Sequence, residues 1–194
     1  MAKIPHIHKN IAKVIANAFG VEKPPISRYW DDNHENFVNI LESVNSPQNG
    51  VTSFATIGLS DHPLILNGKE FDARLEIVGA CGSNFKNFDN VLSTAAFCVI
   101  NSQWFCAPGV IFPDVLSMYD LSPTMSDLYF VPPFLWEENL RTITFEGKKI
   151  AWLLAVPISK AESAFAQEKG PEKLEDLFEK EQIDIYDLHR PSVV

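Results

Sequence analysis

The stretch IAWLLAVPI, residues 150–158, decides the fold because it is an unbroken apolar run of strand length. A strand that is apolar at every position is buried on both faces, so we expect it at the centre of a sheet. Directly after it, Ser159 stands three residues before Glu162, which is the spacing of a capping box at the start of a helix. Gly170 then ends that helix, and Pro171 starts another, where the missing N–H of proline costs nothing.

The residues before this strand predict two more helices and several strands. Apolar residues recur at helical spacing before Gly20, at Ile11, Val14, Ile15 and Phe19, and again over residues 88–101. Strands are expected at residues 37–44, 51–59, 71–79, 110–119, 128–131 and 141–145, and NGK at 67–69 is a usable hairpin turn. Residues 27–34 are expected to lead irregularly into the sheet.

Residues 71–79 alternate in polarity. Asp72, Arg74 and Glu76 point to one face, while the intervening apolar residues point to the other, as a half-buried antiparallel strand requires. Together these patterns predict an α+β fold in a single domain over residues 1–194. We expect a mixed, mainly antiparallel sheet with helices packed mostly on one side.

The charge of the chain excludes a generic nucleic-acid binder. Its 194 residues include 25 acidic and 16 basic ones, for a net charge of -9, and 46% are hydrophobic. Residues 1–28 carry five bases and one acid, so residues 29–194 carry a net charge of -13. Phosphate binding needs clustered Lys and Arg, whereas an acidic surface suits a basic protein partner.

The cysteines indicate a reducing, cytoplasmic setting. Cys81, Cys98 and Cys106 are odd in number and lack CxxC spacing, and no apolar N-terminal run resembles a signal peptide. No stretch approaches the roughly 18 apolar residues of a membrane span. We therefore expect a cytoplasmic protein.

Candidates for catalysis and metal binding are weak. Cys81 stands between two glycines, where a nucleophile could sit, but nothing pairs it with a histidine, and a small apolar filler is the favoured interpretation. Asp31, Asp32 and His34 could ligate a metal, but an Asp-rich turn that caps backbone groups is favoured. His6 and His8 are expected at the surface. We therefore expect no enzyme, no cofactor and no metal.

Aromatic residues offer a further candidate. The four tryptophans are expected in the core or at interfaces rather than as a base-stacking surface. PPFLW, residues 132–136, is a rigid aromatic turn. An elbow that packs Phe134 and Trp136 onto the sheet is favoured over a ridge that binds a partner.

Several segments together resemble a known family. They are SRYWDD (27–32), GVTSFATIGLSD (50–61), EIVGAC (76–81), LSTAAFCVINS (92–102), FVPPFLWEE (130–138), WLLAVPIS (152–159) and EKLEDLFEKEQIDIYDLHRPSV (172–193). In this order they are similar to the bacterial branch of the suppressor of fused (SUFU) domain family. Within it they most resemble small antitoxin or immunity proteins encoded beside LXG-type toxins of Gram-positive bacteria, whose toxic ends are often nucleases.

The resemblance implies a protein that binds its cognate toxin in the cytoplasm and has no catalytic residues. An alternative is a regulatory module that sequesters a host protein such as a transcription factor, as the eukaryotic relatives do. In those relatives an acidic residue near the end of the loop that corresponds to FCVINSQWFCAPG (97–109) helps to hold a peptide. This chain has Ala107 to Val110 there, which departs from that mode of binding.

An acidic inhibitor can imitate the phosphate track of nucleic acid on a basic nuclease and gain association rate from electrostatic steering. Two acidic surfaces are candidates for partner binding, although each has the simpler interpretation of a solvated polar face. One is the turn with Asp31, Asp32 and Glu35, and the other is the helix face with Glu172, Glu175, Asp176 and Glu179.

Overall fold

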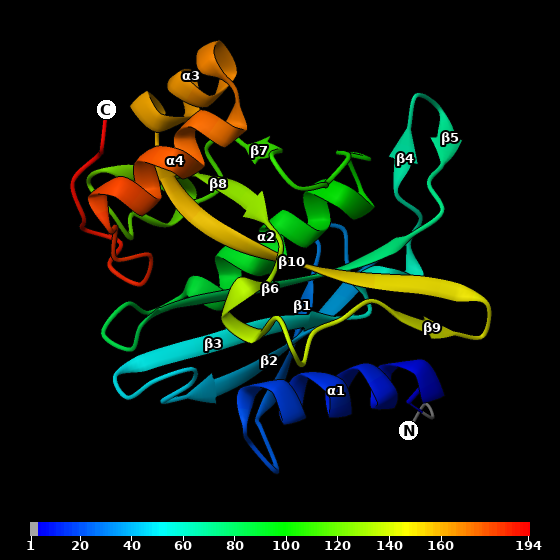
Figure 1. Ribbon diagram of the computed structural model, residues 1–194. Coiled ribbons are helices and arrows are strands. Elements are labelled where there is room, and N and C mark those ends of the chain that lie inside the picture. The colour runs from blue at the N-terminus through cyan, green and yellow to red at the C-terminus, as the bar shows by residue number, and fades with distance from the viewer. Residues whose placement is uncertain (1–3) are drawn as a thin grey trace.

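The computed structural model describes residues 4–194, which form one large mixed sheet flanked by helices (Figure 1). The sheet has eight strands, in the order β1-β2-β3-β6-β10-β8-β7, with β9 paired to β10. Their bounds are β1 Ile26–Trp30, β2 Phe37–Val44, β3 Val51–Ile57, β6 Arg74–Gly82, β7 Ile111–Phe112, β8 Met125–Val131, β9 Ile143–Phe145 and β10 Lys148–Ser159. A separate hairpin joins β4 (Ile65–Leu66) to β5 (Lys69–Glu70) around the expected NGK turn.

Four α-helices accompany the sheet in the described residues. They are α1 His6–Phe19, α2 Phe88–Ile100, α3 Lys160–Lys169 and α4 Pro171–Glu181. Short 3₁₀ turns occur at η1 Leu59–Asp61, η2 Ser117–Tyr119 and η3 Phe134–Trp136. The capping box at Ser159 and Glu162 is present, with the hydroxyl and the carboxylate each accepting a backbone N–H, which confirms the expected start of α3.

β10 occupies the centre of the sheet, as its apolar sequence predicts. It runs parallel to β6 and antiparallel to β8. Residues 152–159 are all buried, because helices or loops cover both faces of the sheet at this strand. The other pairings between neighbouring strands of the sheet are antiparallel, which confirms a mixed, mainly antiparallel sheet.

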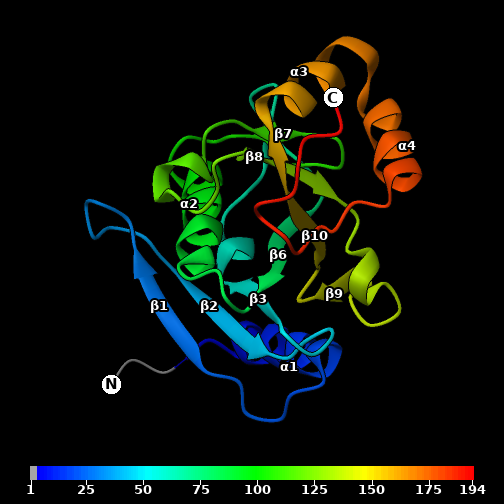
Figure 2. The same cartoon turned by 90° about the vertical axis from the view of Figure 1, so that its left-hand side faces the viewer.

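Each face of the sheet carries its own apolar cluster. α2 packs on one face through Phe88 and Leu92, against residues such as Ile77 of β6. α1 packs on the other face through Ile15, in a cluster that includes Val78 of β6 and to which Phe178 of α4 also contributes. α1 and α4 thus pack on the same face of the sheet, as expected, whereas α2 covers the opposite face (Figure 2).

The structure corrects three local expectations. Residues 26–30 form a regular edge strand rather than an irregular lead-in, because they pair with β2 in antiparallel register. Residues 110–119 contain one short strand, β7, and the 3₁₀ turn η2 rather than a long strand, since the chain turns at Asp114, whose φ is 61°. β6 is buried on both faces rather than one, because it lies between β3 and β10 with α2 and α1 above and below.

Glu76 on β6 is therefore fully buried, although the alternating pattern placed it on a polar face. Its carboxylate accepts hydrogen bonds from the hydroxyls of Thr56 and Ser60 and from the backbone N–H groups of Gly58 and Ser60. Burial raises the pKa of Glu76 against these hydrogen bonds. The group fixes the turn after β3 and has a structural role.

Within residues 4–194, no helix is both long enough and apolar enough to cross a membrane.

Candidate functional site

The main candidate site is a groove of about 520 Å³ between α4 and the turn that follows β8. Its floor is the sheet, through Tyr129 and Val131 of β8 and Val156 of β10. One wall is the turn Pro132–Leu135, and the other is formed by α4 and the segment after it, which contributes Ile183, Ile185 and Tyr186. We call this site the α4 groove.

The proline-rich turn buries one of its aromatic side chains and exposes another. Trp136 is buried and its ring lies 4.7 Å from that of Phe19, between ring centroids, which confirms the elbow for this residue. Phe134 instead remains 53% exposed at the edge of the α4 groove, so the expectation that it packs onto the sheet is wrong. The two prolines fix φ in this turn, so the Phe134 ring is presented by a stiff backbone.

The opposite wall contributes two carboxylates from α4. Glu175 and Glu179 line the α4 groove beside Phe178, one helical turn apart. The hydroxyl of Tyr129 donates a hydrogen bond to Oε1 of Glu175 at 2.6 Å. Burial, followed by this hydrogen bond to a carboxylate, raises the pKa of Tyr129, so the phenol stays protonated and remains a donor at neutral pH.

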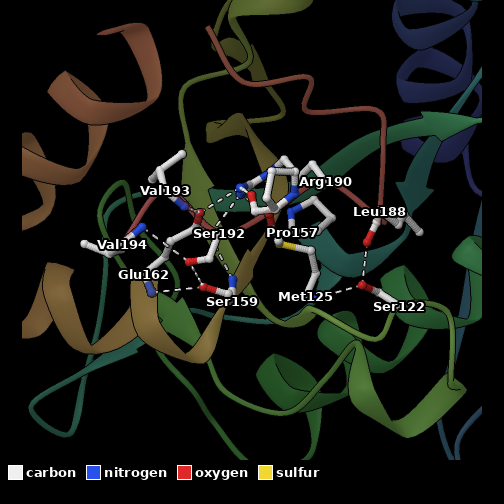
Figure 3. A network of polar contacts seen from close by, with 11 residues as sticks. Ser122, Met125, Pro157, Ser159, Glu162, Leu188, Arg190, Ser192, Val193 and Val194 are labelled. Atoms are coloured by element: carbon white, nitrogen blue, oxygen red, sulfur yellow. Dashed lines mark hydrogen bonds and ion pairs between the residues drawn. The ribbon is translucent and has the colours of Figure 1, made fainter. Parts of the chain in front are cut away.

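A buried ion pair holds the tail wall in place (Figure 3). The guanidinium of Arg190 donates to both carboxylate oxygens of Glu162, at 2.7 and 2.9 Å, and also to the backbone carbonyl of Pro157. Glu162 accepts the backbone N–H of Val193 as well. The Arg190 guanidinium lies 5.4 Å from the centroid of the Phe178 ring, so this network reaches the wall of the α4 groove directly.

A second contact fixes the same wall nearer its start. The backbone N–H of Gly82, at the end of β6, donates to the carbonyl of Tyr186 at 2.8 Å. The tail segment is thus attached to the sheet at Tyr186 and again at Arg190. These contacts fix the wall of the α4 groove that the tail forms, so the groove is present before a ligand binds.

The structure separates the two acidic surfaces expected from the sequence. Asp31 follows β1 at one edge of the sheet, whereas α4 lies over β8 near the other edge (Figure 2). Only Glu175 and Glu179 of the predicted residues line the α4 groove. Asp176, on the same helix, forms an exposed ion pair with Lys173 at 2.8 Å, and Glu172 is exposed outside the lining.

Asp31 is buried and caps its own turn, which confirms the interpretation of an Asp-rich turn. Its carboxylate accepts the backbone N–H groups of Glu35 and Asn36 and the side-chain amides of Asn36 and Asn101. Burial alone would raise the pKa of Asp31, but these hydrogen bonds outweigh it and hold the pKa below its usual value. Asp32 and Glu35 are exposed, and partner binding by Asp31, Asp32 and Glu35 stays a prediction.

The structure also describes the surroundings of the candidate nucleophile Cys81 and of the candidate metal ligands. Cys81 is fully buried, and burial raises the pKa of its thiol to about 12, which opposes thiolate formation at neutral pH. Over residues 4–194, no group of three or more His, Cys, Asp or Glu side chains could hold a metal ion. His6 is exposed as expected, whereas His8 is buried against Asp61 at 2.7 Å, so the surface expectation for His8 is wrong.

Sequence reasoning missed most of the apolar lining of the α4 groove. Ile183 and Ile185 stand on either side of Asp184 in IDIYD, and this spacing of two could have indicated an apolar face after α4. Tyr129 lies in a fully buried stretch of strand, where a tyrosine hydroxyl needs a partner. That partner is on α4, far along the chain, so no local pattern identifies it.

A groove with an apolar lining and two carboxylates has the composition of a binding site, whereas the candidate cysteine and Asp31 serve structure. The chain belongs to the suppressor of fused family: the model of the Suppressor of fused protein (SUFU) family matches residues 34–191. This confirms the resemblance identified from the sequence segments.

Similarity to individual known proteins supports this family assignment. The chain is 48% identical over 187 residues to the immunity protein YqcF of Bacillus subtilis (strain 168), covering 96% of this chain and 97% of that protein. A putative SUFU homologue from Neisseria gonorrhoeae FA 1090 has the same fold, with a TM-score of 0.71, 13% identity and 97% coverage of both chains. Drosophila Suppressor of Fused superposes with a TM-score of 0.66 at 13% identity, covering 99% of this chain and 52% of that one.

A chain of the Sufu–Fu complex gives a TM-score of 0.69 at 12% identity, covering 98% of this chain and 93% of that one. These structural likenesses support the fold assignment. The 48% identity is the comparison that bears on function.

Proposed function

We propose that this protein is an immunity protein that binds a cognate secreted toxin in the cytoplasm and blocks it without catalysis of its own. The observation that carries the proposal is the 48% identity to an immunity protein over nearly the full length of both chains. We further propose that the toxin is of the LXG type with a nuclease at its C-terminal end. The net charge of -9 supports a basic target, since a nuclease must present a basic surface to nucleic acid.

The test is protection of cells from the toxin. The toxic C-terminal domain encoded beside this gene is expressed from an inducible promoter, with this protein or with an empty vector, and viable colonies are counted. We expect this protein to restore viability to that of uninduced cells. A toxic domain from an unrelated locus serves as the specificity control, and equal killing by the cognate toxin in both strains would refute the proposal.

Direct binding is tested with purified components. The full-length protein and the toxic domain should co-elute in size-exclusion chromatography, and DNA or RNA cleavage by the toxin should fall as the protein is titrated to equimolar amounts. Protection of cells without a complex in solution would contradict inhibition by binding. Unimpaired protection by a Cys81→Ala variant would remove the alternative of an enzyme that uses this cysteine.

A further inference from the structure

We propose that the α4 groove is where the toxin docks, and that its occupant is a large apolar side chain next to a Lys or Arg on a basic toxin surface. This inference rests on the proposed function, because it assigns the surface through which that function is performed. It combines an apolar cavity for the side chain with two carboxylates for the neighbouring cation.

The cavity has the size and composition of a side-chain pocket. Its volume of about 520 Å³ exceeds that of any single amino-acid side chain, and ten of its twelve lining residues are apolar or aromatic. The remaining two are Glu175 and Glu179, and none of the twelve is basic. The lining is therefore apolar except for two glutamates, which give it a negative charge.

The exposed ring of Phe134 gives this cavity the character of a binding hot spot. It is 53% exposed on a turn stiffened by Pro132 and Pro133, so little conformational freedom is lost when a partner covers it. Interfaces concentrate affinity in aromatic residues that are positioned in advance. A partner side chain in the α4 groove would bury this ring.

Among residues 4–194, neither of the two carboxylates forms an ion pair with a basic side chain. Like charges one helical turn apart repel, so Glu175 and Glu179 are mutually unfavourable until a positive charge arrives. Both lysines within α4 are engaged elsewhere, Lys173 with Asp176 and Lys180 with Glu181. The buried Tyr129 hydroxyl holds one oxygen of Glu175 and leaves the other oxygen of that carboxylate as an acceptor at the mouth of the α4 groove.

Charge favours the toxin over a second copy of this chain as the occupant. Residues 29–194 carry a net charge of -13, so two copies repel each other as the acidic surfaces approach. A basic toxin is attracted over the same distances. A dimer that forms through the α4 groove is therefore the competing outcome of the test.

The test measures affinity for the purified toxic domain by isothermal titration calorimetry at several salt concentrations. The groove variant carries Glu175→Lys and Glu179→Lys. Its matched control carries Glu172→Lys and Glu181→Lys, which alter the net charge equally on the same helix but outside the lining. Circular dichroism and thermal melting confirm that both variants are folded.

We expect the groove variant to bind at least 100-fold more weakly, with a flatter salt dependence, and the control to stay within about threefold of the original protein. Phe134→Ala should weaken binding at least tenfold without changing the salt dependence. Tyr129→Phe keeps the ring but frees Glu175, and should weaken binding about threefold to tenfold.

Three results would overturn the inference: equal losses in the groove and control variants, unchanged affinity in the groove variant and Phe134→Ala, or a dimer of this chain that Phe134→Ala dissociates in light scattering. Each of these can occur while the original protein still binds and protects, so it leaves the proposed function intact. Absence of binding and protection by the original protein refutes the proposed function instead.

Discussion

Replacement of Arg190 by methionine should destabilise the whole protein, although the residue lies near the end of the sequence. Arg190 is 4% exposed and Glu162 is 0% exposed, so the substitution leaves a buried carboxylate without its cation. It also removes the hydrogen bonds to the carbonyls of Pro157 and Pro191. Loss of one partner of a buried ion pair costs about 3–5 kcal/mol of the free energy of unfolding.

The size of the chain converts this loss into a melting temperature. For proteins of about 150–250 residues, 1 kcal/mol shifts Tm by roughly 2–4 °C, so Arg190→Met should lower Tm by about 6–20 °C. The assay is thermal and urea unfolding followed by circular dichroism at neutral pH. The double variant Arg190→Met with Glu162→Gln should recover part of the loss, because the buried charge is gone.

A loss below about 1 kcal/mol in Arg190→Met would refute the reasoning, since it would mean that the carboxylate is solvated or that the tail detaches at little cost. A double variant less stable than Arg190→Met alone would also contradict it. In that case the hydrogen bonds of Glu162 to the Ser159 and Val193 backbone would outweigh its unpaired charge.

Other consequences of the packing can be tested separately. The hydrogen bond to Asp61 raises the pKa of His8, so the pair's stabilisation of about 0.5–1 kcal/mol should be full below the unfolded pKa of about 6.5 and vanish as pH rises through the folded pKa. Urea unfolding of the original protein and His8→Gln at pH 6 and pH 9 checks this, and a pH-independent difference contradicts it. Gly79→Ala places a Cβ 2.9 Å from a ring carbon of Phe88 and should cost about 1–3 kcal/mol in the same assay, unless α2 shifts freely and the cost is nil. The Cys81 thiol should react with Ellman's reagent only on unfolding, because it is buried and its pKa is about 12, and fast reaction in the native state would disprove this.

Local patterns predicted the parts of the fold that depend on neighbours in sequence. The apolar run of β10 and the capping box at Ser159 are such features, because each is fixed by residues within a few positions. The burial of Glu76 was not predicted, because it depends on residues far away in the sequence. Its burial depends on strands β3 and β10, and on Thr56 and Ser60 that solvate its carboxylate, none of which the alternating pattern of residues 71–79 contains.

The candidate site was predictable only in fragments. Acidity on α4 indicated Glu175 and Glu179, and PPFLW indicated a rigid aromatic turn. These residues line one groove only because of tertiary contacts: β8 and α4 pack together, and the Arg190 network holds the tail. No local sequence pattern contains these contacts. The Asp-rich turn at Asp31 was predictable as well, because a carboxylate in such a turn accepts backbone N–H groups of residues close by in sequence.

The central place of β10 sets the order in which the molecule can be completed. β10 is the last strand along the chain, yet it lies between β6 and β8, so both strands keep an unpaired edge until it is made. The walls of the α4 groove that come from α4 and the tail are synthesised later still. On the proposal that the α4 groove binds a toxin, an emerging chain cannot bind before residues 148–186 have left the ribosome, and we expect cells to need synthesis of this protein to run ahead of the toxin's.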